Sequence, residues 1–311
     1  GTFAHFAARA GAGRVWAVDP DPVVHAARTV ARANGADDRI EFLRGRIPEV
    51  ELPEPIDVLV FEDLPSRLLD DRTFRLLDRV AGALLAPDAR TVPRGARLRL
   101  APVRSAVLRS RLFPLDREDD RSVDEAYGID WGAVRPYLAN QPRGEFLPSD
   151  ALPAEAAAGP HLALIPPPRA EELAVEGRWV LPEGGPVHAL ALWFELEVSV
   201  GLWISNGPGP DTQPWGQVVL PLDPPLAVPE NGTVEARVAP EAFPDGAPGW
   251  LAWAASSEGG EAKGHEFAAY PASLEDLYSG GEAPRSAGAP AGGPDGDAPA
   301  PGSPDRESVG G

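Results

Sequence analysis

The sequence contains neither cysteine nor methionine among its 311 residues. The absence of cysteine excludes disulfides, thiolate metal sites and a cysteine nucleophile. Because the five histidines are scattered without the spacing of metal ligands, we predict no metal site. They are His5, His25, His161, His188 and His265. No apolar run approaches the roughly 18 residues that a membrane span needs, and no signal peptide is visible. We therefore predict a cytoplasmic protein that makes no membrane contact.

Positive charge is also scarce, with 28 lysines and arginines against 47 aspartates and glutamates, a net charge of −19. This balance argues against nucleic acid as a partner and would suit a cationic substrate. The alternative is that the acidity only keeps the protein soluble. Hydrophobic residues make up 43% of the chain. A core can therefore form, and the length allows two domains.

The first 19 residues, GTFAHFAARAGAGRVWAVD, predict a helix, a glycine-rich turn, a short apolar strand and one acid at its end. In nucleotide-binding α/β sheets, a carboxylate about 20 residues after the first glycines accepts hydrogen bonds from ribose hydroxyls. Asp19 takes that position. A first strand and most of a glycine-rich loop are expected upstream of Gly1.

Strands then alternate with helices up to residue 93, which predicts βαβ units and a parallel sheet. Amphipathic helices are predicted at residues 22–34 and 71–85, and strands at residues 39–43 and 56–61. A turn is predicted at Pro87-Asp88.

Strand and turn signals dominate from residue 94 to residue 278, which predicts an antiparallel β domain, a barrel or a sandwich. The segment VHALALWFELEV at residues 187–198 alternates cleanly. His188 would share its apolar face, so a core histidine is favoured over a functional one. Further strands are predicted at residues 97–103, 200–205, 217–222, 233–238 and 250–255. The tail, residues 279–311, is rich in Gly, Pro, Ala and Ser and is predicted to be disordered.

Acidic residues follow the predicted parallel strands, where open α/β sheets bind ligands. They are Asp19, Glu49 and Glu62, with Asp71 nine residues after Glu62. A loop between Glu62 and Asp71 would bring the two carboxylates together, and such a pair binds a guanidinium. The alternative is that Asp71 only caps its helix or lies in the first turn.

Several segments, in one colinear order over about residues 1–255, resemble the catalytic region of protein arginine methyltransferases. They are FAARAGAGRVWAVD, RGRIPEVELP, IDVLVFED, LLAPDARTVPRGARL, YGID, VHALALWFELEV and SNGPGPDTQPWGQVVLPL. These are class I S-adenosylmethionine-dependent enzymes. The chain is identified as a divergent member of that family, truncated at its N-terminus.

The resemblance implies a Rossmann-like domain at residues 1–93 that binds S-adenosyl-L-methionine, followed by an antiparallel β-barrel substrate domain at residues 94–278. It also implies a dimerisation arm at about residues 112–148, which forms a head-to-tail homodimer.

The resemblance also implies roles for residues of the cofactor site. Gly1 would be the last glycine of the cofactor loop, and Asp19 would hold the ribose where the family usually has Glu. Ile47, Pro48 and Glu49 would border the adenine. The family's adenine-contacting glutamate aligns with Pro48, which leaves Glu49 one position late.

Substrate residues follow from the same resemblance. Glu62 would be the first glutamate of the family's two-glutamate loop and would also border the cofactor, and Asp71 replaces the second. Trp215 would be the tryptophan of the Thr-His-Trp loop that walls the substrate pocket, where Pro214 replaces the histidine. Asp63 begins the Asp-Leu-Pro that replaces Trp-Met-Gly.

The first hypothesis is therefore methyl transfer to a guanidinium nitrogen of an arginine in a protein or peptide. Glu62 and Asp71 would orient the guanidinium for direct displacement, and no metal would be required. The alternative is a catalytically degenerate protein that binds a partner through its barrel and arm, because Pro214 and Asp71 depart from the family. A dehydrogenase is a weaker third reading, since nothing after Pro93 resembles a hydride-transfer domain.

Overall fold

A computed structural model describes residues 1–64, 71–114, 127–209, 214–242 and 248–266. The chain divides into two units, Gly1–Tyr270 and Pro271–Gly311. The predicted disordered tail at residues 279–311 lies outside the described residues. None of the described helices combines the length and apolar character needed to cross a membrane.

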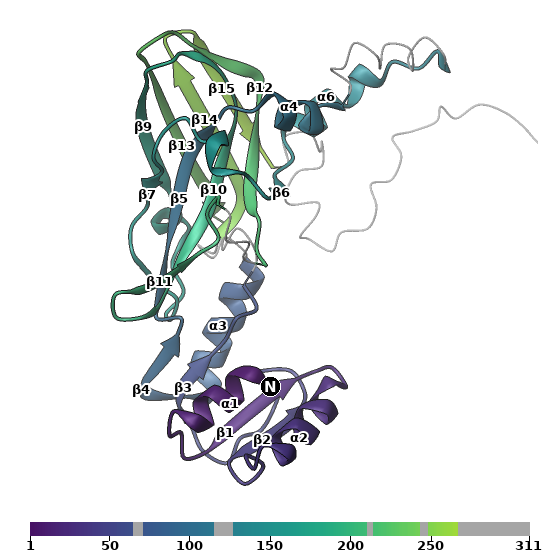
Figure 1. Ribbon diagram of the computed structural model, residues 1–311, viewed down its shortest axis with the longest axis vertical. Coiled ribbons are helices and arrows are strands. Elements are labelled where there is room, and N and C mark those ends of the chain that lie inside the picture. Colours follow the sequence, from purple (N-terminus) through teal and green to yellow (C-terminus); the bar gives the residue numbers. More distant parts are fainter. Residues whose placement is uncertain (65–70, 115–126, 210–213, 243–247, 267–311) are drawn as a thin grey trace, which may run out of the picture. The chain divides into compact units, whose positions relative to one another are not determined.

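The chain begins with one βαβ unit preceded by a helix (Figure 1). Its elements are α1 (Thr2–Arg9), β1 (Val15–Asp19), α2 (Val23–Ala33) and β2 (Ile40–Arg44). Strands β1 and β2 pair in parallel, with Asp19 opposite Arg44 at their carboxyl ends. Small and branched side chains of both helices bury a separate core against β2. The fully or nearly buried members are Ala4, Ala8, Val24, Ala31, Ala36, Ile40 and Phe42.

A second βαβ unit follows, made of β3 (Ile56–Val60), α3 (Asp71–Leu84) and β4 (Leu85–Val92). Strands β3 and β4 are parallel. The predicted βαβ units are confirmed, but the four described parallel strands form two pairs rather than one sheet. The predicted turn at Pro87-Asp88 is wrong, because both residues lie within β4. Pairing shifts there from Ile56–Leu85 to Val58–Arg90, so the proline sits in a bulge that needs no N–H donor.

The rest of the described chain forms two antiparallel sheets. The larger has the order β6-β12-β10-β5-β7, with β11 paired to β10 and β8 to β5. Its strands are β5 (Gly95–Val103), β6 (Arg143–Glu145), β7 (Ala157–Ala158), β8 (Leu162–Ala163), β10 (Gly185–Ser199), β11 (Leu202–Ser205) and β12 (Gln217–Val228). The smaller has the order β15-β14-β13-β9. Its strands are β9 (Val175–Leu181), β13 (Gly232–Ala242), β14 (Pro248–Ser257) and β15 (Gly260–His265).

One large hydrophobic core joins the two sheets. It includes Leu98, Leu190 and Phe194 from the larger sheet and Val234 and Leu251 from the smaller. Among the described strands, none pairs with strands of both sheets, so the predicted barrel is corrected to two sheets that share a core. The edge strands β6 and β7 have only three and two residues. Prolines near β7 and β8 withhold N–H groups that a closed ladder would need.

Strand β10 shows both the strength and the limit of the alternation pattern. Leu190, Leu192, Phe194 and Leu196 face the large core, as predicted, whereas the last residue of the predicted face, Val198, is not part of it. Pairing with β12 shifts between Val187 and Ala189. Because of this irregularity, Val187 joins the large core and His188 does not. The prediction that His188 shares the apolar face of this strand is therefore wrong.

Short helices lie between the strands. They are α4 (Ala106–Leu112), η3 (Trp131–Val134), α6 (Arg135–Ala139), η4 (Ser149–Ala151) and η5 (Ala170–Leu173). Leu108 and Leu112 of α4 pack with Ala191 and Trp193 of β10 in a second core. Part of the predicted arm, residues 115–126, lies outside the described residues.

Candidate functional site

Asp19 ends β1, where the parallel pairing with β2 brings it opposite Arg44. One carboxylate oxygen, Oδ1, accepts the backbone N–H of Asp21 at 2.8 Å. The other oxygen has no hydrogen bond or ion pair with a described residue. The strand end therefore holds the carboxylate in place through one oxygen and leaves the second available to a hydroxyl donor.

Gly1 precedes α1, and its carbonyl accepts both the backbone N–H and the side-chain Nδ1 of His5, at 3.2 and 2.9 Å. A Cβ at this position would lie 3.1 Å from the Phe42 ring and 3.2 Å from the Ala27 Cβ. Glycine thus lets the start of α1 pack closely on β2 and α2. This is the packing task of the last glycine in nucleotide-binding loops.

The predicted adenine-side residues lie in the loop after β2. The Ile47-Pro48 peptide bond is cis, and Ile47 is half-buried against the large core. Pro48 is half-buried and Glu49 is exposed. The loop is closed by the Glu49 backbone N–H, which donates to the Arg46 carbonyl at 2.8 Å. The loop presents an apolar side chain beside an exposed carboxylate.

Glu62 follows the carboxyl end of β3, and its side chain is exposed. Its backbone carbonyl accepts the Leu64 N–H at 2.8 Å, while its carboxylate has no hydrogen bond or ion pair with a described residue. Asp71 begins α3, but its side chain and residues 65–70 lie outside the described part. The predicted meeting of Glu62 and Asp71 stays a prediction.

Trp215 is half-buried and packs against the large core. Its ring meets the Phe194 ring edge-on, with centroids 5.6 Å apart. Two buried amides beside it, Asn206 and Gln217, were missed by sequence reasoning. Asn206 resembles an ordinary turn residue before Gly207, and only the apolar run after Gln217 signals that this amide enters the interior.

His188 is buried, as predicted for a core histidine. Its Nδ1 accepts the backbone N–H of Ser105 at 3.1 Å. Burial of the imidazole, followed by the charges of Arg109 and Arg104, lowers the pKa of His188. The lowered pKa favours the neutral imidazole, which accepts the Ser105 N–H as a structural contact.

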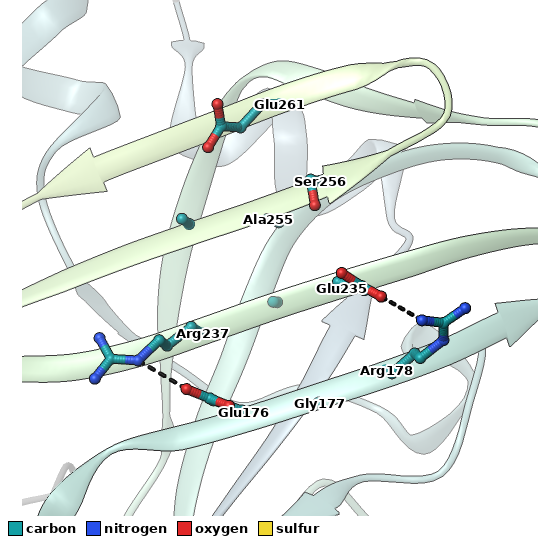
Figure 2. A pocket seen from close by; sticks show the side chains of 10 residues that line it. Glu176, Gly177, Arg178, Glu235, Arg237, Ala255, Ser256 and Glu261 are labelled. Atoms are coloured by element: carbon teal, nitrogen blue, oxygen red, sulfur yellow. Dashed lines mark hydrogen bonds and ion pairs between the residues drawn. The ribbon is translucent and has the colours of Figure 1, made fainter.

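A pocket lies on the outer face of the smaller sheet, away from every predicted site residue (Figure 2). Two cross-strand ion pairs frame it, Arg178 with Glu235 at 2.5 Å and Arg237 with Glu176 at 2.9 Å. These charges neutralise each other across paired strands. The arrangement is typical of a solvated sheet face rather than of a catalytic site.

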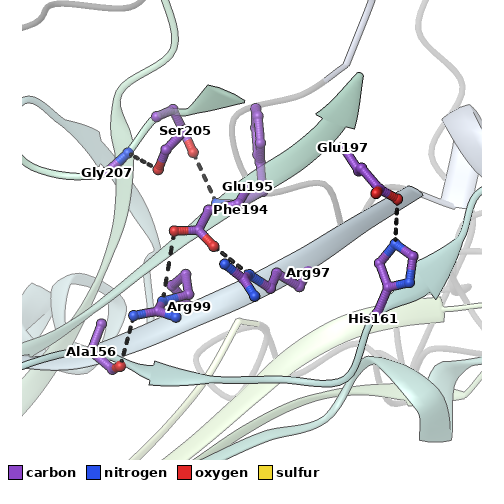
Figure 3. Close-up of polar contacts among 10 residues, drawn as sticks. Arg97, Arg99, Ala156, His161, Phe194, Glu195, Glu197, Ser205 and Gly207 are labelled. Carbon is purple, nitrogen blue, oxygen red and sulfur yellow. Dashed lines mark hydrogen bonds and ion pairs between the residues drawn. The ribbon is translucent and has the colours of Figure 1, made fainter. Parts of the chain in front are cut away.

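A polar network covers part of the outer face of β5 and β10 (Figure 3). Glu195 pairs with Arg97, and Arg99 donates to the Ala156 carbonyl at 3.0 Å. Glu197 pairs with His161 at 3.3 Å. The network satisfies charges at a sheet surface, and it includes none of the predicted site residues. Among the described residues, no three His, Asp or Glu side chains gather to hold a metal ion.

No protein-family model matches the chain, but it is similar to proteins named arginine methyltransferases. The probable histone-arginine methyltransferase CARM1 of Oryza sativa subsp. indica is 27% identical over 254 aligned residues, covering 76% of this chain and 46% of the relative. Protein arginine N-methyltransferase 1 of Schizosaccharomyces pombe is 28% identical over 229 residues, covering 71% and 64%. The chain thus spans about half to two-thirds of the length of these relatives.

Solved structures of arginine methyltransferases superpose on this chain. Arabidopsis thaliana protein arginine methyltransferase 10 superposes with a TM-score of 0.65 at 17% identity, covering 86% of each chain. A chain of the Trypanosoma brucei PRMT1 enzyme-prozyme complex superposes with a TM-score of 0.69 at 19% identity, covering 84% of each. The fold therefore corresponds to that of these structures, with a Rossmann-like domain followed by a β domain. Sequence and fold thus agree in their likeness: the relatives and the solved structures reported above are all named as arginine methyltransferases.

Proposed function

We propose that the protein is an S-adenosylmethionine-dependent methyltransferase whose substrate is an arginine in a protein or peptide. One observation carries the proposal: a relative named as an arginine methyltransferase aligns over 76% of the chain. The exposed Glu62, two residues after the end of β3, adds a carboxylate that suits an arginine substrate. The Glu62 carboxylate makes no contact within the described residues that would compete with a guanidinium. The activity is proposed for the whole protein.

The residues at the carboxyl ends of β1 and β2 fit S-adenosylmethionine. Asp19 offers one carboxylate oxygen to a ribose hydroxyl, and its other oxygen is fixed by the Asp21 N–H. Ile47 offers an apolar surface to a purine, with Glu49 exposed beside it. Two of the similar solved structures are named for complexes with AdoHcy or SAH. When bound, S-adenosylmethionine supplies an electrophilic methyl group on a positively charged sulfur.

Glu62 has the chemistry to bind and orient an arginine side chain. A carboxylate accepts two parallel N–H bonds from a guanidinium, which fixes the plane of the group and the direction of its nitrogens. We expect Asp71 to supply the second carboxylate and Trp215 to wall the pocket. The net charge of −19 favours the approach of a cationic peptide.

We also propose a homodimer formed through an arm within residues 112–148, and a cytoplasmic location. The T. brucei PRMT1 structure is named as a heterotetrameric complex, which supports oligomerisation as a trait of this kind of protein. No observation favours the alternative of a purely protein-binding module.

The test is methyl transfer from labelled S-adenosylmethionine to arginine-rich peptides by the full-length protein. We expect Glu62→Gln to lower kcat/KM by about a hundredfold, because a neutral amide loses the charge that orients the guanidinium. Asp63→Asn is the matched control, since it removes the neighbouring exposed charge and should change the rate little. Equal rates for Glu62→Gln and wild type would contradict the proposed role of Glu62.

A further inference from the structure

Two side-chain amides are buried at the ends of the segment that carries Trp215. Asn206 is 1% exposed and Gln217 is 4% exposed. Burying an amide without hydrogen-bond partners is costly. A pair of amides kept in the interior on either side of one short segment therefore points to a positional task, which their contacts reveal.

Both amides have partners for oxygen and nitrogen. Asn206 Oδ1 accepts the Phe194 N–H at 2.8 Å, and Asn206 Nδ2 donates to the Gly216 carbonyl at 2.9 Å. Gln217 Oε1 accepts the Leu147 N–H at 2.7 Å, and Gln217 Nε2 donates to the Asn206 carbonyl. The two amides thus tie the ends of residues 206–217 to each other, to β10 and to Leu147. We call this set of four hydrogen bonds the amide clamp.

The amide clamp is connected to Trp215 in two ways, through the backbone and through Phe194. Asn206 holds the carbonyl of Gly216, the residue that follows Trp215. Phe194 gives its backbone N–H to Asn206 and its ring to the Trp215 ring. Gly216 lies so close to β6 that a Cβ would be 2.8 Å from the Glu145 carbonyl oxygen. The backbone on the C-terminal side of Trp215 therefore has little room to shift.

We propose that Asn206 and Gln217 are positioning residues, which hold Trp215 where it walls the arginine pocket. The inference rests on the proposed function, because that function gives Trp215 its role. Neither amide is placed on the substrate, and both act through the backbone on either side of the tryptophan. Alignment of a reacting nitrogen is sensitive to displacements of about 1 Å, which cost on the order of a hundredfold in rate.

The test uses two nearly isosteric changes in the full-length protein. Asn206→Asp keeps the oxygen that accepts the Phe194 N–H but replaces the donor to Gly216 by a second oxygen. Gln217→Glu does the same to the donor that reaches Asn206. Ser205→Ala is the matched control, because Ser205 directly precedes this segment and its exposed hydroxyl accepts the Gly207 N–H at 3.0 Å without entering the interior.

Two readouts need no substrate. Hydrogen exchange of the peptide that covers residues 206–217 reports the clamp, and acrylamide quenching of Trp215, taken as the difference from Trp215→Phe, reports the indole. We expect both to rise at least threefold in the two clamp variants and to stay at the wild-type level in Ser205→Ala. Unchanged exchange and quenching in both clamp variants would overturn the proposal, whatever the activity does.

Kinetics then separate the two claims. We expect kcat for an arginine-rich peptide to fall at least tenfold in the clamp variants, with the Kd for S-adenosylhomocysteine within twofold of wild type. Wild-type kcat and KM in both variants would overturn the positioning role and leave the proposed function standing. A wild-type protein that neither binds S-adenosylhomocysteine nor transfers methyl groups would overturn the proposed function, and the positioning role with it.

Discussion

The backbone N–H of Ser105 donates to Nδ1 of His188 across 3.1 Å. Ser105 is also the N-cap of α4, where its hydroxyl oxygen accepts the Leu108 N–H at 3.1 Å. One buried imidazole therefore fixes the residue that starts a helix of the second core. Nδ1 can accept this bond only while its lone pair is free of a proton, so the contact links the protonation state of His188 to stability.

His188 should make the protein less stable in mild acid. Its pKa is lowered in the folded state relative to the ordinary value of 6.5. Below pH 6.5, the unfolded chain therefore binds more protons than the folded chain, and the free energy of unfolding falls as the pH falls toward the lowered value. Urea unfolding between about pH 8 and pH 5 measures this slope. We expect a shallower slope for His188→Asn and an unchanged slope for the exposed control His25→Asn; equal slopes in all three proteins would contradict the assignment.

Asp223 should be a strong contributor to stability among the charged residues. Its carboxylate accepts from Arg109 at 2.8 Å and from two nitrogens of Arg135 at 2.7 Å. Asp223 and Arg109 are largely buried. We expect Asp223→Asn to lower the free energy of unfolding by about 3 kcal/mol, because it removes one side of a largely buried ion pair.

The matched control is Glu235→Gln, which breaks the exposed ion pair with Arg178. Exposed pairs contribute about 0–1 kcal/mol, so the urea concentration at the unfolding midpoint should be nearly the same for Glu235→Gln and wild type. Similar losses for the two variants would show that burial does not decide the strength of the Asp223 pair.

Gly216 should not tolerate a side chain. Its Cβ would lie 2.8 Å from the Glu145 carbonyl oxygen, and a backbone oxygen cannot swing aside as a flexible side chain can. We expect Gly216→Ala to cost about 1–3 kcal/mol in urea unfolding, as overpacking does elsewhere. Gly144→Ala, in the facing strand β6, meets nothing within 4 Å and should be neutral or slightly stabilising. If Gly144→Ala proved the more damaging of the two, the close approach at Gly216 would be discounted.

Much of the fold was predictable because its elements obey simple periodicities. The helices α1 and α2 and the strands β1, β3 and β5 lie within a few residues of their predicted bounds. Strand β9, with the sequence VEGRWVL, was missed because Gly177 interrupts its alternation, although the Trp179 ring covers that glycine. The shift between Val187 and Ala189 depends on pairing with β12, and a single strand's sequence does not encode its partner.

The candidate site also has a part that the sequence could predict and a part that it could not. Asp19 and Glu62 follow parallel strands, so their placement at strand ends follows from local sequence. The structure adds that Glu62 is exposed and that one Asp19 oxygen accepts the Asp21 N–H. The amide clamp was not predictable, because Asn206 and Gln217 are polar residues beside a turn. Only the tertiary contacts reveal that both are buried and bonded.

The most direct test of the account is isothermal titration of S-adenosylhomocysteine into the full-length protein. We expect micromolar binding, and a loss of about ten- to a hundredfold in Asp19→Ala, because a charged acceptor for a ribose hydroxyl is removed. Asp21→Ala is the control, since it removes a carboxylate two residues away and keeps the backbone N–H that holds Asp19. Absence of binding, or binding that Asp19→Ala leaves unchanged, would contradict the assignment of a methyltransferase cofactor site to the end of β1.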